Sequence, residues 1–196
     1  MKNNTRHPEF NNSLVRGGRG LKRLKWTSLA IAISTFTVTA CDDVVKSSPS
    51  SLLVTNTAAR TADIYLIAGY NRSNLWENFN GYSNGHLTIS VPVGYHVRLH
   101  ITNDGGIPYD VGIYTLNQQL AFPGAGNSLE DYLNNPAAGI MPGSSAIYSF
   151  VANRTGEFRL ADYLYRFPEH HPSHLPLGMW GVFRVTPTGV PQATST

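Results

Sequence analysis

Histidines gather in one short segment of this chain. Three of its seven histidines fall within five residues, at His170, His171 and His174, with Asp162 before the segment and Met179 after it. Imidazole and carboxylate donors suit Cu(II) in a tetragonal site, imidazole and thioether donors suit Cu(I), and carboxylates also accept Zn(II) or Fe(III). The spacing therefore predicts a metal site made from these side chains. A solvated polar loop without metal is the alternative.

The position of Asp162 strengthens the first interpretation. Phe158 and Leu160 alternate with polar residues in a strand pattern, so Asp162 falls on their inward face at the end of that strand. A buried carboxylate is costly unless it is protonated, paired or bound to a cation. Arg159 and Arg166 are possible partners that require no metal.

Motifs for other kinds of chemistry are missing from the sequence. There is no ordered Ser–His–Asp set, no Gly-rich phosphate loop, no HExxH and no CxxC. We therefore expect that the protein is not an enzyme. A metalloenzyme with an open copper site remains a third interpretation.

Short strand patterns separated by Gly and Pro account for most of the chain. Such a pattern predicts an all-β domain, a sandwich or a barrel. Within one strand, His96, Arg98 and His100 alternate with apolar residues, which predicts that these three face solvent. The expected strands cover residues 63–68, 87–93, 97–101, 111–114, 146–151, 158–162 and 182–185.

The N-terminal segment has the features of a targeting signal. Basic residues end at Lys25, and residues 26–40 carry no charge. This apolar run is shorter than the roughly 20 residues that a membrane-spanning helix needs, but it has the length found in signal peptides. It ends in Val38-Thr39-Ala40-Cys41, which resembles the bacterial lipobox, and Cys41 is the only cysteine. We expect cleavage before Cys41 and a lipid on its sulfur.

The charge distribution argues against nucleic acid as a partner. Seven of the 15 basic residues and one of the 12 acidic residues precede Cys41, which leaves 8 basic and 11 acidic residues, a net charge near −3. A nucleic-acid-binding domain is usually basic. The expected location is the bacterial cell envelope, lipid-anchored on the periplasmic side, and Asp42 favours the inner membrane.

The domain organisation follows from these segments. We expect a lipoprotein signal peptide over residues 1–40 and, over residues 41–60, the lipidated cysteine followed by a flexible tether of small polar residues. Residues 61–186 form the folded domain, and residues 187–196 form a flexible tail.

Several motifs resemble sulfocyanin, a membrane-associated blue copper protein of the cupredoxin superfamily. They are N-F-N-G-Y-S-N-G at residues 78–85, V-P-V-G at residues 91–94, P-A-A-G-I-M-P at residues 136–142 and G-M-W-G at residues 178–181. The resemblance spans roughly residues 76–185. It implies an all-β, cupredoxin-like Greek-key β-sandwich or barrel, preceded here by the lipoprotein signal peptide and tether.

The resemblance also implies where copper ligands would lie. The family uses two His, a Cys and a Met. The first His aligns with Tyr109, the Cys with Asp162 and the second His with His174, while Met179 keeps the Met. Without the thiolate a blue Cu–S site cannot form, so the resemblance implies copper in a remodelled site that includes His170 or His171. Tyr109 would close the fourth side by packing or through its hydroxyl.

Together these observations predict a membrane-anchored, extracytoplasmic protein. It would bind copper in a non-blue site and serve copper handling or electron transfer beside a respiratory or copper-handling membrane protein. The alternative is a metal-free structural module on the same scaffold that docks on a partner membrane protein.

Overall fold

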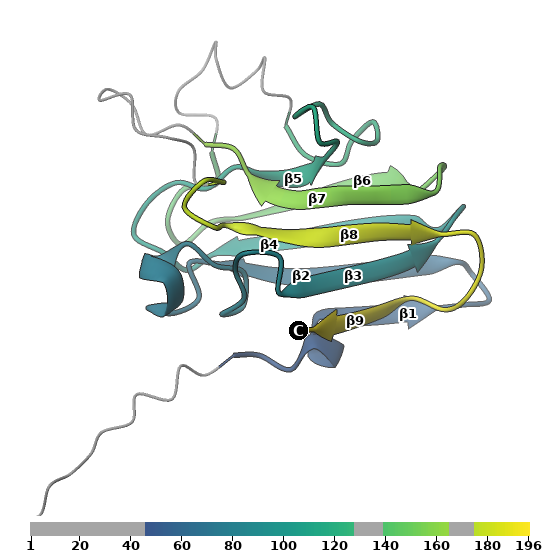
Figure 1. Cartoon of the computed structure of the whole chain (residues 1–196), viewed down its shortest axis with the longest axis horizontal. Coiled ribbons are helices and arrows are strands. Elements are labelled where there is room, and N and C mark those ends of the chain that lie inside the picture. Colours follow the sequence, from purple (N-terminus) through teal and green to yellow (C-terminus); the bar gives the residue numbers. More distant parts are fainter. Residues whose placement is uncertain (1–45, 128–138, 165–174) are drawn as a thin grey trace, which may run out of the picture. The chain divides into compact units, whose positions relative to one another are not determined.

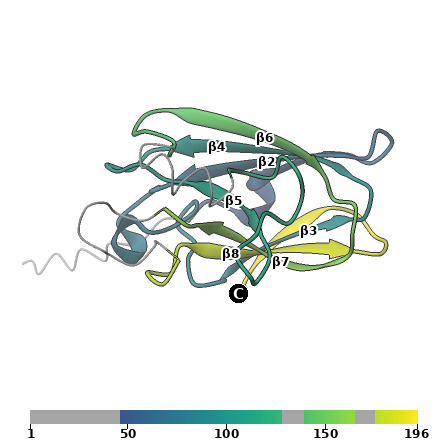
Figure 2. The same cartoon turned by 90° about the horizontal axis from the view of Figure 1, so that it is seen from above.

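A computed structural model describes residues 46–127, 139–164 and 175–196, which form two facing β-sheets (Figures 1 and 2). The four-stranded sheet has the order β1-β2-β4-β6, and the five-stranded sheet has the order β5-β7-β8-β3-β9. β2 pairs with β4 and β3 with β8 in parallel, and the remaining pairs are antiparallel. The strands are β1 (Leu53–Asn56), β2 (Thr61–Ala68), β3 (Leu87–Pro92), β4 (His96–Asn103), β5 (Val111–Tyr114), β6 (Ser145–Val151), β7 (Gly156–Asp162), β8 (Trp180–Thr186) and β9 (Gln192–Ser195).

The expected all-β, cupredoxin-like sandwich is confirmed, and every strand expected from the sequence coincides with one of these. The only helical elements among the described residues are two short 3-10 turns, η1 (Pro49–Leu52) and η2 (Ser73–Trp76). No helix in this described part is long and apolar enough to cross a membrane.

Alternating apolar residues of the two sheets build the core between them. Leu99 and Ile101 of β4 and Ile89 and Val91 of β3 are buried, as the period-two pattern requires. At one end the core is aromatic: the Phe122 ring lies 5.2 Å from that of Phe150 and 4.9 Å from that of Phe158. Core burial at both inner faces explains why one strand register is selected.

Both ends of the described chain belong to the sheets. Residues 49–56, expected as part of a flexible tether, form η1 and β1, and β1 pairs antiparallel with β2. β9, in the expected flexible tail, pairs with β3. Their sequences lack a strong apolar alternation because these edge strands have few buried side chains. Hydrogen bonds to β2 and β3 hold them in the strand conformation instead.

The loop before β3 is held by buried asparagine side chains. The Asn78 amide donates to the carbonyl oxygens of Asn71 (2.9 Å) and Ser73 (2.7 Å), and its oxygen accepts from the Gly81 N–H. The Asn80 side-chain oxygen accepts from the Ile67 N–H at 2.9 Å. These amides satisfy backbone groups that no strand pairs, which gives the N-F-N-G motif its structural role.

The same loop forces three consecutive side chains into a left-handed turn. Asn74, Leu75 and Trp76 have φ values of 50°, 56° and 72°, although only Asn among them tolerates this region well. Leu75 is 85% exposed, so no burial of its side chain offsets the strain. Leu75 therefore adopts a left-handed backbone conformation that leucine disfavours.

We expect Leu75→Asn to stabilise the fold by about 1 kcal/mol, because asparagine relieves the left-handed strain. Urea unfolding of the chain from residue 42 onward measures this. Leu116→Asn is the control, since Leu116 is 69% exposed and has no positive φ, and it should change little. An unchanged or lower stability for the Leu75 variant would contradict the interpretation.

Candidate metal centre

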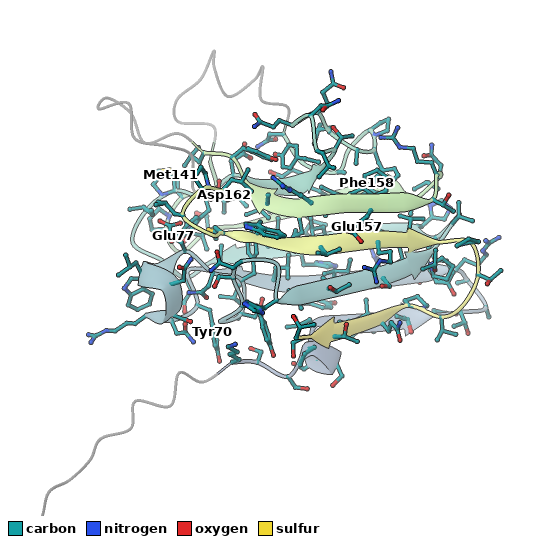
Figure 3. The ribbon with its side chains drawn as sticks, viewed as in Figure 1. Tyr70, Glu77, Met141, Glu157, Phe158 and Asp162 are labelled. Carbon is teal, nitrogen blue, oxygen red and sulfur yellow. The ribbon has the colours of Figure 1, made fainter. Side chains whose placement is uncertain are left out.

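Asp162 ends β7 with a fully buried carboxylate (Figure 3). Its Oδ1 accepts hydrogen bonds from two backbone N–H groups, that of Asp110 at 3.1 Å and that of Leu164 at 2.7 Å. The position that the resemblance assigns to the ligand Cys thus holds a side chain that accepts hydrogen bonds from two backbone N–H groups.

Met179 lies beside Asp162 through the backbone. Its carbonyl oxygen accepts from the Asp162 N–H at 3.2 Å, and its side chain is fully buried in the main core cluster. The residue directly precedes β8, the neighbour of β7. Two of the expected ligand positions are therefore adjacent through their backbones.

Tyr109 occupies the position of the first His and is fully buried. Its hydroxyl donates to the Trp76 carbonyl at 3.1 Å, and its backbone pairs with Ile140. Gly69 and Gly105 lie so close to its ring that an added Cβ on either would approach the hydroxyl to 3.0 Å or less. Of the two roles expected for Tyr109, packing and hydroxyl contact, the structure shows packing combined with a hydrogen bond to η2.

Asp110 is a second buried carboxylate at this end, which the sequence did not single out. It is fully buried; its Oδ1 accepts from the Asn127 amide at 3.2 Å, and its carbonyl accepts from the Tyr163 N–H. Its N–H is one of the two donors to Asp162. In the sequence, the feature that could have indicated its burial is its position between Tyr109 and Val111, which are both buried.

Two tyrosines lie near these carboxylates. Burial raises the pKa of Tyr114 well above its ordinary value, and the nearby Asp110 and Asp162 raise it further. Burial also raises the pKa of Tyr148 to about 12, again with a contribution from Asp110. Both phenols therefore stay protonated at neutral pH.

The described part of the chain does not supply the donors of a blue copper site. A blue site needs a thiolate, and position 162 carries a carboxylate while the only cysteine is Cys41. A buried carboxylate oxygen suits Cu(II) once imidazoles complete the set. Within the described residues there is no group of three His, Cys, Asp or Glu. His170, His171 and His174 lie outside the described residues, so their ligation remains a prediction.

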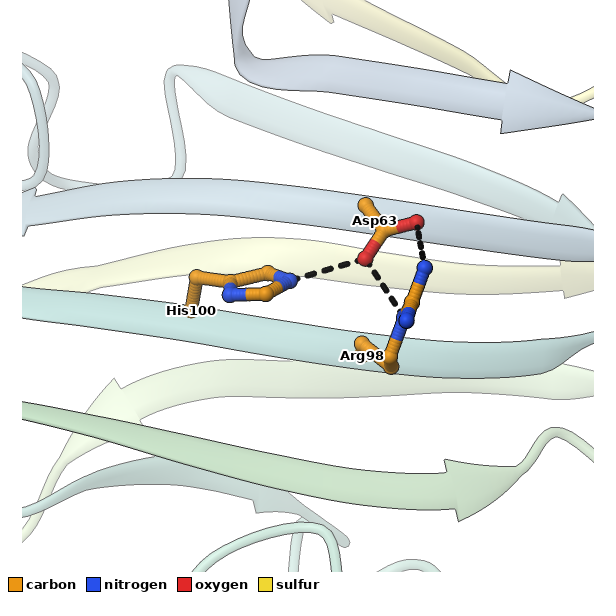
Figure 4. A network of polar contacts seen from close by, with 3 residues as sticks. All are labelled: Asp63, Arg98 and His100. Atoms are coloured by element: carbon orange, nitrogen blue, oxygen red, sulfur yellow. Dashed lines mark hydrogen bonds and ion pairs between the residues drawn. The ribbon is translucent and has the colours of Figure 1, made fainter.

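A second polar cluster lies on the outer face of the four-stranded sheet (Figure 4). The Asp63 carboxylate accepts from the Arg98 guanidinium at 2.6 Å and contacts His100 Nε2 at 2.8 Å. The His100 ring stacks on Tyr65 with centroids 4.5 Å apart. Arg98 and His100 do face outward as expected, but they are joined to Asp63 across the β2–β4 pair rather than simply solvated.

Comparison with known proteins agrees with this fold. The family model for the sulfocyanin (SoxE) domain matches residues 47–129. Comparison with curated proteins gives no match. The two mixed sheets have the cupredoxin-like arrangement. Over residues 47–129 the chain is similar to the sulfocyanin domain.

Similar solved structures include two auracyanins and a blue copper oxidase. Auracyanin from the photosynthetic bacterium Roseiflexus castenholzii is 18% identical, with 64% of this chain and 97% of that chain covered and a TM-score of 0.39. For auracyanin B the identity is 17%, the coverages are 70% and 96%, and the TM-score is 0.43. The blue copper oxidase from Nitrosomonas europaea is 24% identical, with 57% of this chain and 32% of that chain covered and a TM-score of 0.41. This chain thus spans about a third of the length of that oxidase.

We expect Asp162→Leu to destabilise the protein by about 1–3 kcal/mol for each N–H group that it leaves buried without an acceptor. Asp162→Asn keeps an oxygen for the Asp110 and Leu164 N–H groups and should cost clearly less. Urea unfolding compares the two variants. Equal losses would show that these hydrogen bonds do not stabilise the site.

The Asp63 cluster predicts a pH dependence of stability. Burial raises the pKa of Asp63, but the hydrogen bonds from Arg98 and His100 outweigh it, so the net pKa lies below the ordinary 3.8. A lowered folded pKa contributes stability that is present well above pH 3.8 and is lost as the pH falls through the folded value. The stability advantage over Asp63→Asn should therefore shrink in acid.

Thermal unfolding from neutral pH down into the acid range measures that advantage. Glu157→Gln is the matched control, because the Glu157–Arg184 pair at 2.8 Å is half exposed on both sides and contributes little. A stability difference between wild type and Asp63→Asn that does not depend on pH would contradict the lowered pKa of Asp63 in the folded protein.

Proposed function

We propose that this chain is a membrane-anchored, extracytoplasmic cupredoxin-like protein that binds copper in a site without a thiolate. The observation that carries the proposal is the buried Asp162 carboxylate at the position of the ligand Cys, held by two N–H groups beside Met179. A second buried carboxylate, Asp110, lies at the same end and donates its N–H to Asp162. Carboxylate oxygen is a donor that Cu(II) accepts once imidazoles complete the set.

Asp162, His174 and one of His170 and His171 would hold Cu(II), and Met179 would suit Cu(I). When bound, copper supplies a one-electron redox couple or a transferable cargo ion. Asp162 would be oriented by its two N–H donors, and Tyr109, bonded to Trp76, would close the site by packing. The proposed role is copper handling or electron transfer beside a respiratory or copper-handling membrane protein, without an enzymatic reaction of its own.

The proposed location rests on the N-terminal sequence. Cys41 would carry lipid after cleavage of residues 1–40, and Asp42 favours retention in the inner membrane. The domain would then lie on the periplasmic side of the envelope. The net charge near −3 after Cys41 disfavours nucleic acid.

A second candidate function is a metal-free interaction module. The contacts of Tyr109 with Trp76 and of Asp162 with two N–H groups favour it, because protein groups alone already satisfy these side chains in part. In this case the cupredoxin scaffold would be retained for docking on a partner membrane protein.

A copper titration separates the two functions. With the chain from residue 42 onward, we expect stoichiometric Cu(II) binding by calorimetry and a type-2 EPR spectrum, abolished by His174→Ala and weakened by Asp162→Asn. His96→Ala, on the outer face of β4, is the histidine control and should bind normally. Binding no tighter than millimolar, about −4 kcal/mol, would overturn the copper proposal and leave the metal-free module.

A further inference from the structure

The left-handed turn at η2 presents apolar side chains to solvent in a fixed conformation. Leu75 is 85% exposed and Trp76 is 43% exposed. The Asn74 amide holds the turn by donating to the carbonyl oxygens of Glu77 (2.8 Å) and Leu177 (2.7 Å), and Leu177 is itself 42% exposed. Strained backbone conformations of this kind cluster at functional sites.

The chain enters the domain against the same loop. The Ser47 N–H donates to the Asn80 carbonyl at 3.1 Å, and the Tyr82 hydroxyl donates to the Ser47 carbonyl at 2.6 Å. An added Cβ on Gly81 would lie 3.1 Å from both the Asn71 side chain and Lys46. Asn71 in turn binds the Ser73 N–H at the start of η2. The entry point and the apolar turn are therefore parts of one hydrogen-bonded unit.

The distance from this entry point to the expected lipid is short. Four residues separate Cys41 from Lys46, and a fully extended chain advances at most about 3.6 Å per residue, so the two Cα atoms are within about 18 Å of each other. If Cys41 is lipidated, the loop that carries η2 must stay close to the bilayer surface.

We propose that Leu75 and Trp76 insert into the interface of the bilayer to which the chain is anchored. This rests on the proposed lipidation of Cys41. Tryptophan favours the membrane–water interface because its ring is apolar and its N–H is polar, and leucine favours the acyl region. Arg72 and Lys46, both exposed near the turn, would face lipid phosphates.

The proposal determines the orientation of the domain relative to the membrane. η2 lies at the same end of the sandwich as Asp162 (Figure 3), so the candidate metal centre would face the bilayer. The turn between β8 and β9, which contains Val190, lies at the opposite end (Figure 1) and would face away from it.

Site-directed spin labelling of the mature lipoprotein in nanodiscs of mixed neutral and anionic lipid tests the proposal. Leu75→Cys introduces the only free thiol, because the lipid blocks the sulfur of Cys41. Val190→Cys is the matched control, since Val190 is 65% exposed at the far end. We expect the label at position 75 to lose access to a water-soluble nickel chelate and gain collisions with oxygen, and the label at position 190 to show the reverse.

A second measurement keeps the native turn. Trp180→Phe leaves Trp76 as the single tryptophan of the mature chain, because Trp26 precedes the expected cleavage site. Brominated acyl chains should then quench Trp76 fluorescence, and adding Leu75→Asn, which is expected to keep the fold, should reduce the quenching.

The outcomes separate the two proposals. A mass spectrum without diacylglycerol on Cys41 means that the lipoprotein proposal has failed, and the membrane orientation fails with it. A lipidated protein whose labels at positions 75 and 190 are equally open to the nickel chelate overturns only the insertion. In that case protection that appears after a membrane protein is added would identify the turn as a protein-docking surface.

Discussion

The burial of the Asp162 carboxylate sets the arrangement of one whole end of this molecule. Its two N–H donors come from Asp110, directly before β5, and from Leu164, two residues further along the chain, while its own N–H reaches the Met179 carbonyl. The carboxylate therefore joins the start of β5 to the segment that follows β7, and the backbone of Asp162 joins the end of β7 to the residue before β8. Any side chain at this place must accept the same hydrogen bonds, so an anionic group suits it better than an apolar one.

The asparagine-rich loop imposes a second constraint at the same end. The side chains of Asn74, Asn78 and Asn80 hydrogen-bond to backbone groups of this loop and of β2. The Trp76 carbonyl accepts from the Tyr109 hydroxyl, so the loop is also bonded to one of the candidate site residues. The exposed turn and that residue are thus joined directly.

This connection relates the two proposals without making them equivalent. The proposed copper binding would depend on Asp162, Met179, His174 and one of His170 and His171, whereas the proposed membrane contact would depend on residues 46–82. If both hold, the metal centre faces the bilayer and any redox or copper-handling partner must present its own site at membrane level. The outer face of the four-stranded sheet, with the Asp63 cluster, is left to face the aqueous compartment.

Much of the fold could be predicted from the sequence because period-two alternation reports directly on burial. Leu87, Ile89 and Val91 are buried as their spacing requires, and the N-F-N-G and V-P-V-G motifs indicate the cupredoxin-like fold by their resemblance. The edge strands β1 and β9 could not be predicted in the same way. Their order comes from hydrogen bonding to β2 and β3, which leaves little hydrophobic signal in their own residues.

The sequence by itself determined the sandwich, because the alternation of apolar residues along the strands reports which side chains are buried. Only the tertiary structure decided that Asp110 is a second buried carboxylate, that Tyr109 is bonded to Trp76, and that Asp63 joins Arg98 to His100. The physical reason is that these contacts link residues far apart in the chain, and a local pattern reports whether a side chain is buried but not which distant group satisfies it.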